Sequence, residues 1–314
     1  MAHPRTFRFA IMLSRARGPE AWAELARKAE GLGYSTLMMA DHFSDQFGIF
    51  PALTAAAGAT TTLRVGSLVL GNDFRHPAVV AKDAATVDVL SGGRLEFGLG
   101  TGWAISDYEP IGMPLEAPGV RVNRWIESIQ VIKGLWGADP CSFSGQHYNI
   151  TDLNGTPKPT QQPNPPIIMG GGGKRVLTAA ATYADIVSMN PNVGSGRFDA
   201  ATAATMTASA TDEKYRWVKD AAGDRLADLE LSFLKFAFAL TAPADRDATE
   251  EKVATGLGLT PAQVRESPYA LVGSADQLAE ELQSDRERWG VSYVVVQRDA
   301  LDAFAPVVAK LAGT

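Results

Sequence analysis

The 314-residue sequence is short of several features, and each shortage excludes a class of protein. It contains one cysteine, Cys141, so an intrachain disulfide and a cysteine-only metal cluster are both excluded. It has no run of 18 or more apolar residues, and the apolar stretch between Met1 and Arg17 is too short for a secretory signal. We therefore expect a cytoplasmic protein that does not enter a membrane.

Histidine is scarce, and basic residues are not in excess. The four histidines, at positions 3, 42, 76 and 147, are dispersed and form no His-x-x-x-His pair, so we expect no metal site. The net charge of −6 leaves no basic excess for a phosphate backbone, so we expect no nucleic-acid partner. A hydrophobic content of 46% with 20% charged residues is that of a soluble globular protein with an ample core.

What the sequence does contain is an alternation of short apolar runs with longer helical patterns. Eight strands are predicted, at Phe7–Leu13, Thr36–Ala40, Arg64–Leu70, Leu95–Gly100, Ile167–Met169, Asp185–Met189, within Leu231–Leu240, and at Ser292–Gln297. No hairpin signal separates the first four, which favours parallel strands joined by helical crossovers. Eight βα units in about 300 residues is the count of a TIM (β/α)8 barrel, whereas a doubly wound sheet needs only five or six strands.

One continuous domain, residues 1–314, is the economical interpretation. The proline-rich segment 138–166 is predicted to be an irregular or hairpin insertion after strand four. Alanine-rich, charged segments at about 190–228 and 241–268 are predicted to be helical insertions, the latter after strand seven. These insertions either cap the barrel mouth or are surface elaborations without a role.

The stretch from Pro165 to Arg175 places four glycines, Gly170–Gly173, at a strand-to-helix turn. Bare backbone, the free N–H groups of a new helix and the neighbouring Lys174 and Arg175 together favour a phosphate group. The spacing is neither a Rossmann fingerprint nor a P-loop. The alternative is a flexible glycine turn between packed elements.

Other polar and glycine residues follow the second, third and fourth predicted strands. They are Asp41 and His42, then Gly71, Asn72 and Asp73, then Thr101, Gly102 and Trp103. Because the active site of a TIM barrel lies at the carboxyl ends of its strands, we expect these residues on one rim. The alternatives are a helix cap with a surface imidazole for Asp41-His42, and core packing for Trp103.

Three stretches resemble the bacterial luciferase-like monooxygenase superfamily: Ser91–Trp103, the Gly71-Asn72 turn, and Pro166–Gly172. The likeness extends from Phe9 to about Met189 and again from Val272 to Gln297. It implies a TIM barrel that binds either FMN or the deazaflavin coenzyme F420, with the ring in the barrel mouth.

Within that superfamily, Asp41-His42-Phe43 looks more like the F420-dependent branch. The resemblance places Gly71-Asn72 at a bulge behind the ring, commonly a non-prolyl cis peptide. It implies that the cofactor is bound by Asp41, Gly71, Asn72, Thr101, Gly102, Trp103, Met169, Gly170, Gly171, Gly172, Gly173, Lys174 and Arg175.

Trp103 is a departure, because the sugar-phosphate dehydrogenases of that branch have a glutamate there. An aromatic side chain instead favours a flat or hydrophobic substrate. We predict an F420-dependent oxidoreductase that transfers a hydride between the deazaflavin and a small organic substrate. His42 is the candidate for proton transfer, and Asp41 either orients it or hydrogen-bonds the ring.

Two other functions stay open at this point. One is an FMN-dependent monooxygenase that uses reduced flavin and O2, and the other is a non-catalytic flavin-binding barrel. The resemblance also implies a homodimer. The apolar faces of the first three helices suit a dimer interface, and they suit packing on the barrel equally well. The sequence does not identify the substrate or the direction of hydride transfer.

Overall fold

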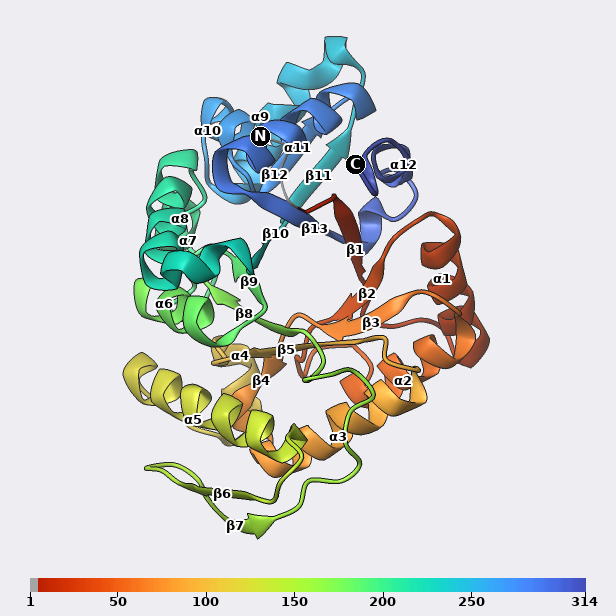
Figure 1. Cartoon of the computed structure of the whole chain (residues 1–314). Coiled ribbons are helices and arrows are strands. Elements are labelled where there is room, and N and C mark those ends of the chain that lie inside the picture. Colours follow the sequence, from red (N-terminus) through yellow and green to blue (C-terminus); the bar gives the residue numbers. More distant parts are fainter. Residues whose placement is uncertain (1–4) are drawn as a thin grey trace.

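The computed structural model describes residues 5–314, so His3 lies outside the described residues. Eight parallel strands pair side by side and close into a barrel, because the first strand pairs with both the second and the last. Figure 1 shows the barrel with its helices around it. The barrel strands are β1 (Arg8–Met12), β2 (Thr36–Met39), β3 (Arg64–Ser67), β5 (Leu95–Gly100), β8 (Ile167–Gly171), β9 (Ile186–Met189), β10 (Glu230–Leu234) and β13 (Val291–Gln297). The predicted TIM barrel is confirmed.

One helix follows each barrel strand and packs on the outside of the barrel (Figure 1). Pro19, Pro77 and Pro118 begin three of these helices, where the missing N–H of proline costs no hydrogen bond. The helices are α1 (Pro19–Gly31), α2 (Ile49–Ala59), α3 (Pro77–Leu90), α5 (Pro118–Trp136), α6 (Lys174–Tyr183), α8 (Ala208–Ala222), α11 (Ala275–Trp289) and α12 (Ala305–Leu311).

Shorter elements lie on the connections. Segment 138–166 contains an antiparallel hairpin, β6 (Cys141–Ser144) and β7 (Asn149–Leu153), which lies at the edge of the molecule beyond α3 and α5 (Figure 1). The other short elements are β4 (Leu70–Gly71), η1 (Asn72–Phe74), α4 (Ile105–Tyr108), η2 (Glu109–Ile111), α7 (Ala200–Ala204), η3 (Gly223–Ala227), η4 (Pro243–Asp245), α9 (Arg246–Leu257), α10 (Pro261–Glu266) and η5 (Arg298–Ala300).

The seventh strand is shorter than the apolar stretch that predicted it. Within Leu231–Leu240, only the part up to Leu234 belongs to the barrel, as the end of β10. The rest forms β11 (Ala237–Leu240), which pairs with β12 (Ala270–Gly273) in a separate two-stranded parallel sheet. The sequence interpretation missed β12, because a four-residue apolar run has no periodicity of its own.

Apolar side chains fill the barrel and separate its two ends. The interior cluster consists of Ala10, Met38, Leu68, Ile168, Ile186, Tyr293 and Val295. A larger apolar cluster lies between the strands and the outer helices. This is the core expected for a TIM barrel, in which alternate strand residues face inward and outward.

A buried ionic network closes the amino-terminal end of the barrel. The Glu96 side chain is 1% exposed and accepts hydrogen bonds from Arg64 Nε at 2.8 Å and the Tyr293 hydroxyl at 2.8 Å. Arg8 pairs with both Glu96 and Glu230. Each of these residues is among the first three residues of its strand. The opposite, carboxyl end of the barrel is therefore the one open to a ligand.

Candidate functional site at the carboxyl rim

His42 follows β2 at this rim and is held by a carboxylate from another segment. Its Nδ1 atom lies 2.6 Å from Oδ2 of Asp107 on α4. The other oxygen of Asp107 accepts the backbone N–H of Phe43 at 3.2 Å. The His42 ring also stands edge-on to the Trp103 ring, with centroids 6.1 Å apart and an interplanar angle of 89°. The structure thus brings together His42 and Trp103, which the sequence predicted, and adds Asp107.

Asp41 does not orient His42. Its carboxylate forms an ion pair with Arg75, with Oδ2 at 2.5 Å from Nη1, and accepts the backbone N–H of Gly71 at 3.1 Å. Both oxygens are therefore used to hold the turn after β4 against the end of β2. The contact with His42 that was predicted for Asp41 is made by Asp107 instead. The other role predicted for Asp41, a hydrogen bond to the cofactor ring, stays a prediction.

The single-turn helix α4 is anchored next to Asp107 as well. The Tyr108 hydroxyl donates to Oδ2 of Asp73 at 2.9 Å, and Arg124 Nε donates to Oδ1 of Asp73 at 2.9 Å. Burial and the neighbouring charge of Asp73 raise the pKa of the Tyr108 phenol, so the phenol keeps its proton and stays a donor. Consecutive residues of α4 thus contact two different rim segments.

Gly102 is required by this arrangement. Its φ angle is +71°, and a Cβ atom there would lie 1.9 Å from the Tyr108 hydroxyl oxygen. Any side chain at this position would therefore displace Tyr108 from Asp73. Gly102 shapes the rim through its own backbone, and the neighbouring Thr101 hydroxyl donates locally to the Gly102 carbonyl at 3.2 Å.

The non-prolyl cis peptide lies between Leu68 and Val69, not at Gly71-Asn72 where the resemblance placed it. Strand β3 ends at Ser67 and pairing with β5 resumes at Leu70 in β4, so the irregular segment is three residues earlier than expected. Asn72 is 2% exposed, and neither polar atom of its buried side-chain amide has a hydrogen-bond partner within residues 5–314. Such an unpartnered amide suits a ligand at the rim, so the prediction that Asn72 contacts the cofactor stands as a prediction.

The glycines after β8 serve two purposes. A Cβ atom on Gly170 would lie 2.1 Å from the Ser188 carbonyl oxygen, and one on Gly172 would lie 2.3 Å from the Asn192 nitrogen. Gly170 thus allows β8 to lie close to β9, and Gly172 allows the turn after β8 to lie close to the segment after β9. A Cβ atom on Gly173 would meet nothing within 4 Å. Only Gly173, at the amino end of α6, leaves open space for a ligand.

A matched pair of substitutions separates these two purposes. Gly170→Ala is expected to lower the free energy of unfolding by about 1–3 kcal/mol, because the strand backbones must move apart. Gly173→Ala is expected to change it by less than about 1 kcal/mol, because its φ of −97° suits alanine while alanine is a poorer N-cap residue than glycine. Urea denaturation of both variants measures the difference. Equal losses of stability would show that the close approach at Gly170 does not decide its identity.

The amino end of α6 has the features of an anion site. No side chain caps it, and the exposed Lys174 forms no ion pair with any residue from 5 to 314. Arg175 is partly committed, because it donates to the Asn123 side chain and to the Gly119 carbonyl at 3.3 Å. Free N–H groups and the helix dipole therefore act together with one uncommitted lysine.

Met169 does not reach the rim. Its side chain is fully buried in the outer core, between the barrel and the helices, whereas its neighbour Ile168 faces the barrel interior. Since alternate strand residues face opposite sides, an inward Ile168 dictates an outward Met169. Direct contact of the Met169 side chain with a ligand in the barrel mouth is therefore excluded.

Asn190 is a rim residue that the sequence interpretation missed. It follows β9, and its backbone N–H donates to the Gly171 carbonyl at 2.9 Å. Its side-chain Oδ1 is buried and has no hydrogen-bond partner within residues 5–314. A buried acceptor without a partner suits a ligand that brings an N–H group. The only sequence signal for it was a polar residue directly after a predicted strand.

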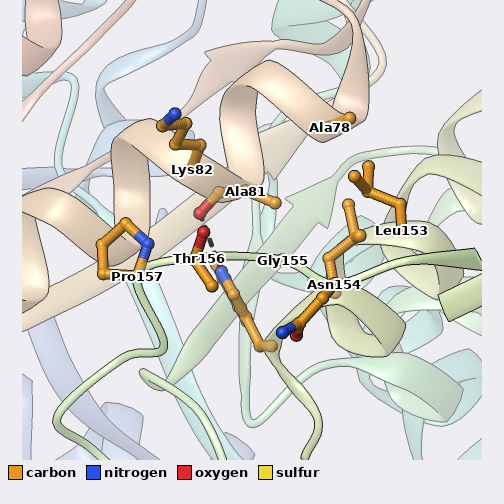
Figure 2. A pocket seen from close by; sticks show the side chains of 10 residues that line it. Ala78, Ala81, Lys82, Leu153, Asn154, Gly155, Thr156 and Pro157 are labelled. Carbon is orange, nitrogen blue, oxygen red and sulfur yellow. Dashed lines mark hydrogen bonds between the residues drawn. The ribbon is translucent and has the colours of Figure 1, made fainter. Parts of the chain in front are cut away.

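The described surface also has two hollows outside the barrel, neither of which contains a predicted site residue. A cavity of about 130 Å³ lies between α3, the end of α5 and residues 153–157 (Figure 2). A groove of about 420 Å³ runs along α11 and the α9–α10 excursion. Among residues 5–314 we find no group of three His, Cys, Asp or Glu side chains placed to hold a metal ion. None of the described helices has the length and apolar character needed to span a membrane.

The chain is a TIM barrel with a candidate site at its carboxyl rim, and sequence comparison identifies its family. The model of the luciferase-like monooxygenases matches residues 6–214, more than half of the sequence. The chain therefore belongs to the luciferase-like monooxygenase family, which confirms the resemblance seen in the sequence.

The curated relatives include an FMNH2-dependent monooxygenase and F420-dependent dehydrogenases. An FMNH2-dependent dimethylsulfone monooxygenase of Pseudomonas putida is 31% identical over 175 residues, 54% of this chain and 48% of that protein. An F420-dependent glucose-6-phosphate dehydrogenase of Amycolatopsis mediterranei is 34% identical over 163 residues, 49% of each. The chain thus matches about half the length of these curated relatives.

A solved structure extends the likeness of fold to nearly the whole chain. The coenzyme F420-dependent tetrahydromethanopterin reductase from Methanopyrus kandleri superimposes with a TM-score of 0.78 at 19% identity. The superposition covers 98% of this chain and 99% of that one. At this level of identity the likeness establishes the fold alone.

Proposed function

We propose that the protein is an oxidoreductase that transfers a hydride between coenzyme F420 and a small organic substrate at the carboxyl rim. The observation that carries the proposal is the position of His42, which is held at the end of β2 by Asp107 and stands beside Trp103. A hydride transfer to or from carbon needs one proton to be added or removed, and an imidazole does this near neutral pH.

The rim fits a cofactor of this kind. The open amino end of α6, Gly173 and Lys174 would hold its phosphate, and Oδ1 of Asn190 would accept an N–H of its ring. A bound deazaflavin supplies hydride transfer and reacts poorly with O2, because carbon replaces the N5 nitrogen. The protein's own task is to hold the two reacting carbons in line and to manage the proton at His42.

The substrate we propose is flat or hydrophobic, such as an enone, a nitroarene or an alcohol. Trp103 lies beside the His42 ring, at the position where the resemblance gives the sugar-phosphate dehydrogenases a glutamate. Two further aromatic side chains on rim segments are exposed, Phe43 at 56% and Phe198 at 43%. Exposed aromatic groups at the mouth of a site favour binding of an apolar ligand.

The second candidate is an FMN-dependent monooxygenase that uses reduced flavin and O2. The similarity to the dimethylsulfone monooxygenase favours it as directly as the similarity to the F420-dependent dehydrogenase favours our first candidate. Separate titrations of the purified protein with F420 and FMN distinguish the two, because the absorption spectra of the two cofactors differ. Binding of F420 with no binding of FMN is expected, and the reverse would contradict our proposal.

The same titration tests the phosphate site. Lys174→Ala is expected to weaken cofactor binding about 10- to 100-fold, because a hydrogen bond to a charged group contributes roughly 1.5–3 kcal/mol. Lys82→Ala is the matched control, since Lys82 is an exposed lysine beside the outer cavity (Figure 2). Equal cofactor affinities in the two variants would place the phosphate elsewhere.

A further inference from the structure

The contact between His42 and Asp107 determines which ring nitrogen of His42 carries the hydrogen. We propose that Asp107 is a positioning residue that keeps the proton of neutral His42 on Nδ1, so that Nε2 is the atom that exchanges a proton with the substrate. The geometry of the two side chains determines the tautomer. The exchange of a proton with the substrate rests on the function proposed above.

The donor and acceptor properties of the two groups dictate the tautomer. An ionised carboxylate only accepts hydrogen bonds, and a neutral imidazole has one N–H and one bare nitrogen. With Nδ1 at 2.6 Å from Oδ2 of Asp107, the hydrogen must lie on Nδ1 and the lone pair on Nε2. Asp107 is 6% exposed, so water does not readily replace this contact.

The carboxylate is fixed in orientation on both sides. Its second oxygen accepts the N–H of Phe43, the residue that follows His42, so both oxygens act on the same short rim segment. The next residue of α4, Tyr108, is tied to Asp73, which Arg124 also contacts. Asp107 therefore cannot rotate away from His42 without also losing the Phe43 N–H, and the Tyr108–Asp73 contact holds the α4 backbone in place.

Asp107→Asn is the informative substitution. When the new side-chain amide keeps its oxygen on the Phe43 N–H, it presents its NH2 group to His42, and that group donates instead of accepting. The imidazole then bonds the amide through a bare Nδ1 and carries its hydrogen on Nε2. Substitution of a buried aspartate by asparagine beside a catalytic histidine can thus keep the geometry while reversing the tautomer.

Nuclear magnetic resonance of protein with ¹⁵N-labelled histidine tests this without cofactor or substrate. At a pH where His42 is neutral, we expect the Nδ1–H form in the unmodified protein and a shift toward the Nε2–H form in Asp107→Asn. The His42→Gln variant assigns the signals. Asp45→Asn is the control, because Asp45 lies on the same rim segment but is exposed and pairs with Arg15. An Nε2–H form in the unmodified protein, or an unchanged tautomer in Asp107→Asn, would overturn the inference.

Kinetics then separates the inference from the proposed function. With F420 and an accepted substrate, Asp107→Asn is expected to lower kcat at least ~10²-fold with little change in KM or in cofactor affinity. An unchanged kcat would overturn the assignment of Nε2 as the proton-exchanging atom. If the unmodified protein shows the Nδ1–H form but no hydride transfer with F420, the proposed function fails and the positioning of His42 by Asp107 stands.

Discussion

His42→Ala is expected to lower turnover about 10²- to 10⁴-fold, with only a modest loss of cofactor affinity. The reason is that the imidazole is the rim group held for proton transfer, by Asp107 at 2.6 Å, while the proposed phosphate site lies on another segment, at the start of α6. Steady-state rates with F420 give the first quantity, and the spectral titration gives the second.

The control for this variant is an exposed histidine elsewhere in the chain. His76 accepts the Ala78 N–H at 3.2 Å at the start of α3, and His76→Asn retains a capping acceptor there. We expect His76→Asn to keep full turnover. Full activity of His42→Ala would remove His42 from the mechanism, whereas equal losses in both variants would indicate general damage to the fold.

Glu96→Gln is expected to destabilise the protein by about 3–5 kcal/mol, the largest effect on stability that we predict. Glu96 is 1% exposed and is the shared partner of Arg8 and Arg64. Glutamine has nearly the same shape but no charge, so the two guanidinium groups lose the carboxylate that compensates them at the amino end of the barrel. Urea denaturation at neutral pH measures the loss.

The same network predicts a pH dependence. Burial alone raises the pKa of Glu96, but the charges of Arg8 and Arg64, with hydrogen bonds from Arg8 and Tyr293, hold it below its usual value near 4.5. A folded-state pKa below the unfolded-state value contributes stability above the unfolded pKa, and this contribution is lost as the pH falls through the folded pKa. The difference between the original protein and Glu96→Gln should therefore be full at pH 7 and shrink below about pH 4.

The control for this substitution is an exposed glutamate. Glu24→Gln changes a surface residue of α1 and is expected to alter stability by less than about 0.5 kcal/mol. A loss of stability at Glu96 no larger than that at Glu24 would show that the buried network does not hold the barrel together. A difference independent of pH down to about pH 2 would show that Glu96 is not ionised in the folded protein.

Several features of the site were predictable because they depend on local pattern and order along the chain. The alternation of apolar runs and helical segments predicted eight βα units, and the barrel then placed His42 and Trp103 on one rim. The helix after Gly173 was likewise recognisable from its sequence, as was its free amino end. Each of these features depends on a short, continuous stretch of the chain.

Other assignments could not be decided from the sequence, because they depend on which way a side chain faces. The apolar run before the glycines predicts a strand equally well whichever residue points outward, and Met169 turned out to face the helices. Glycine likewise permits either close packing or a bare surface for a ligand. Only the neighbouring Ser188 and Asn192 show that Gly170 and Gly172 serve packing, while Gly173 is open.

The sequence by itself determined the barrel, its family and the rim on which His42 lies. The tertiary structure alone decided the partners: Asp107 for His42, Arg75 for Asp41, and both Arg8 and Arg64 for Glu96. His42 and Asp107 are 65 residues apart in the chain, and nothing in either local segment specifies the contact. The register and closure of the barrel bring such groups together, and those depend on the packing of all eight strands at once.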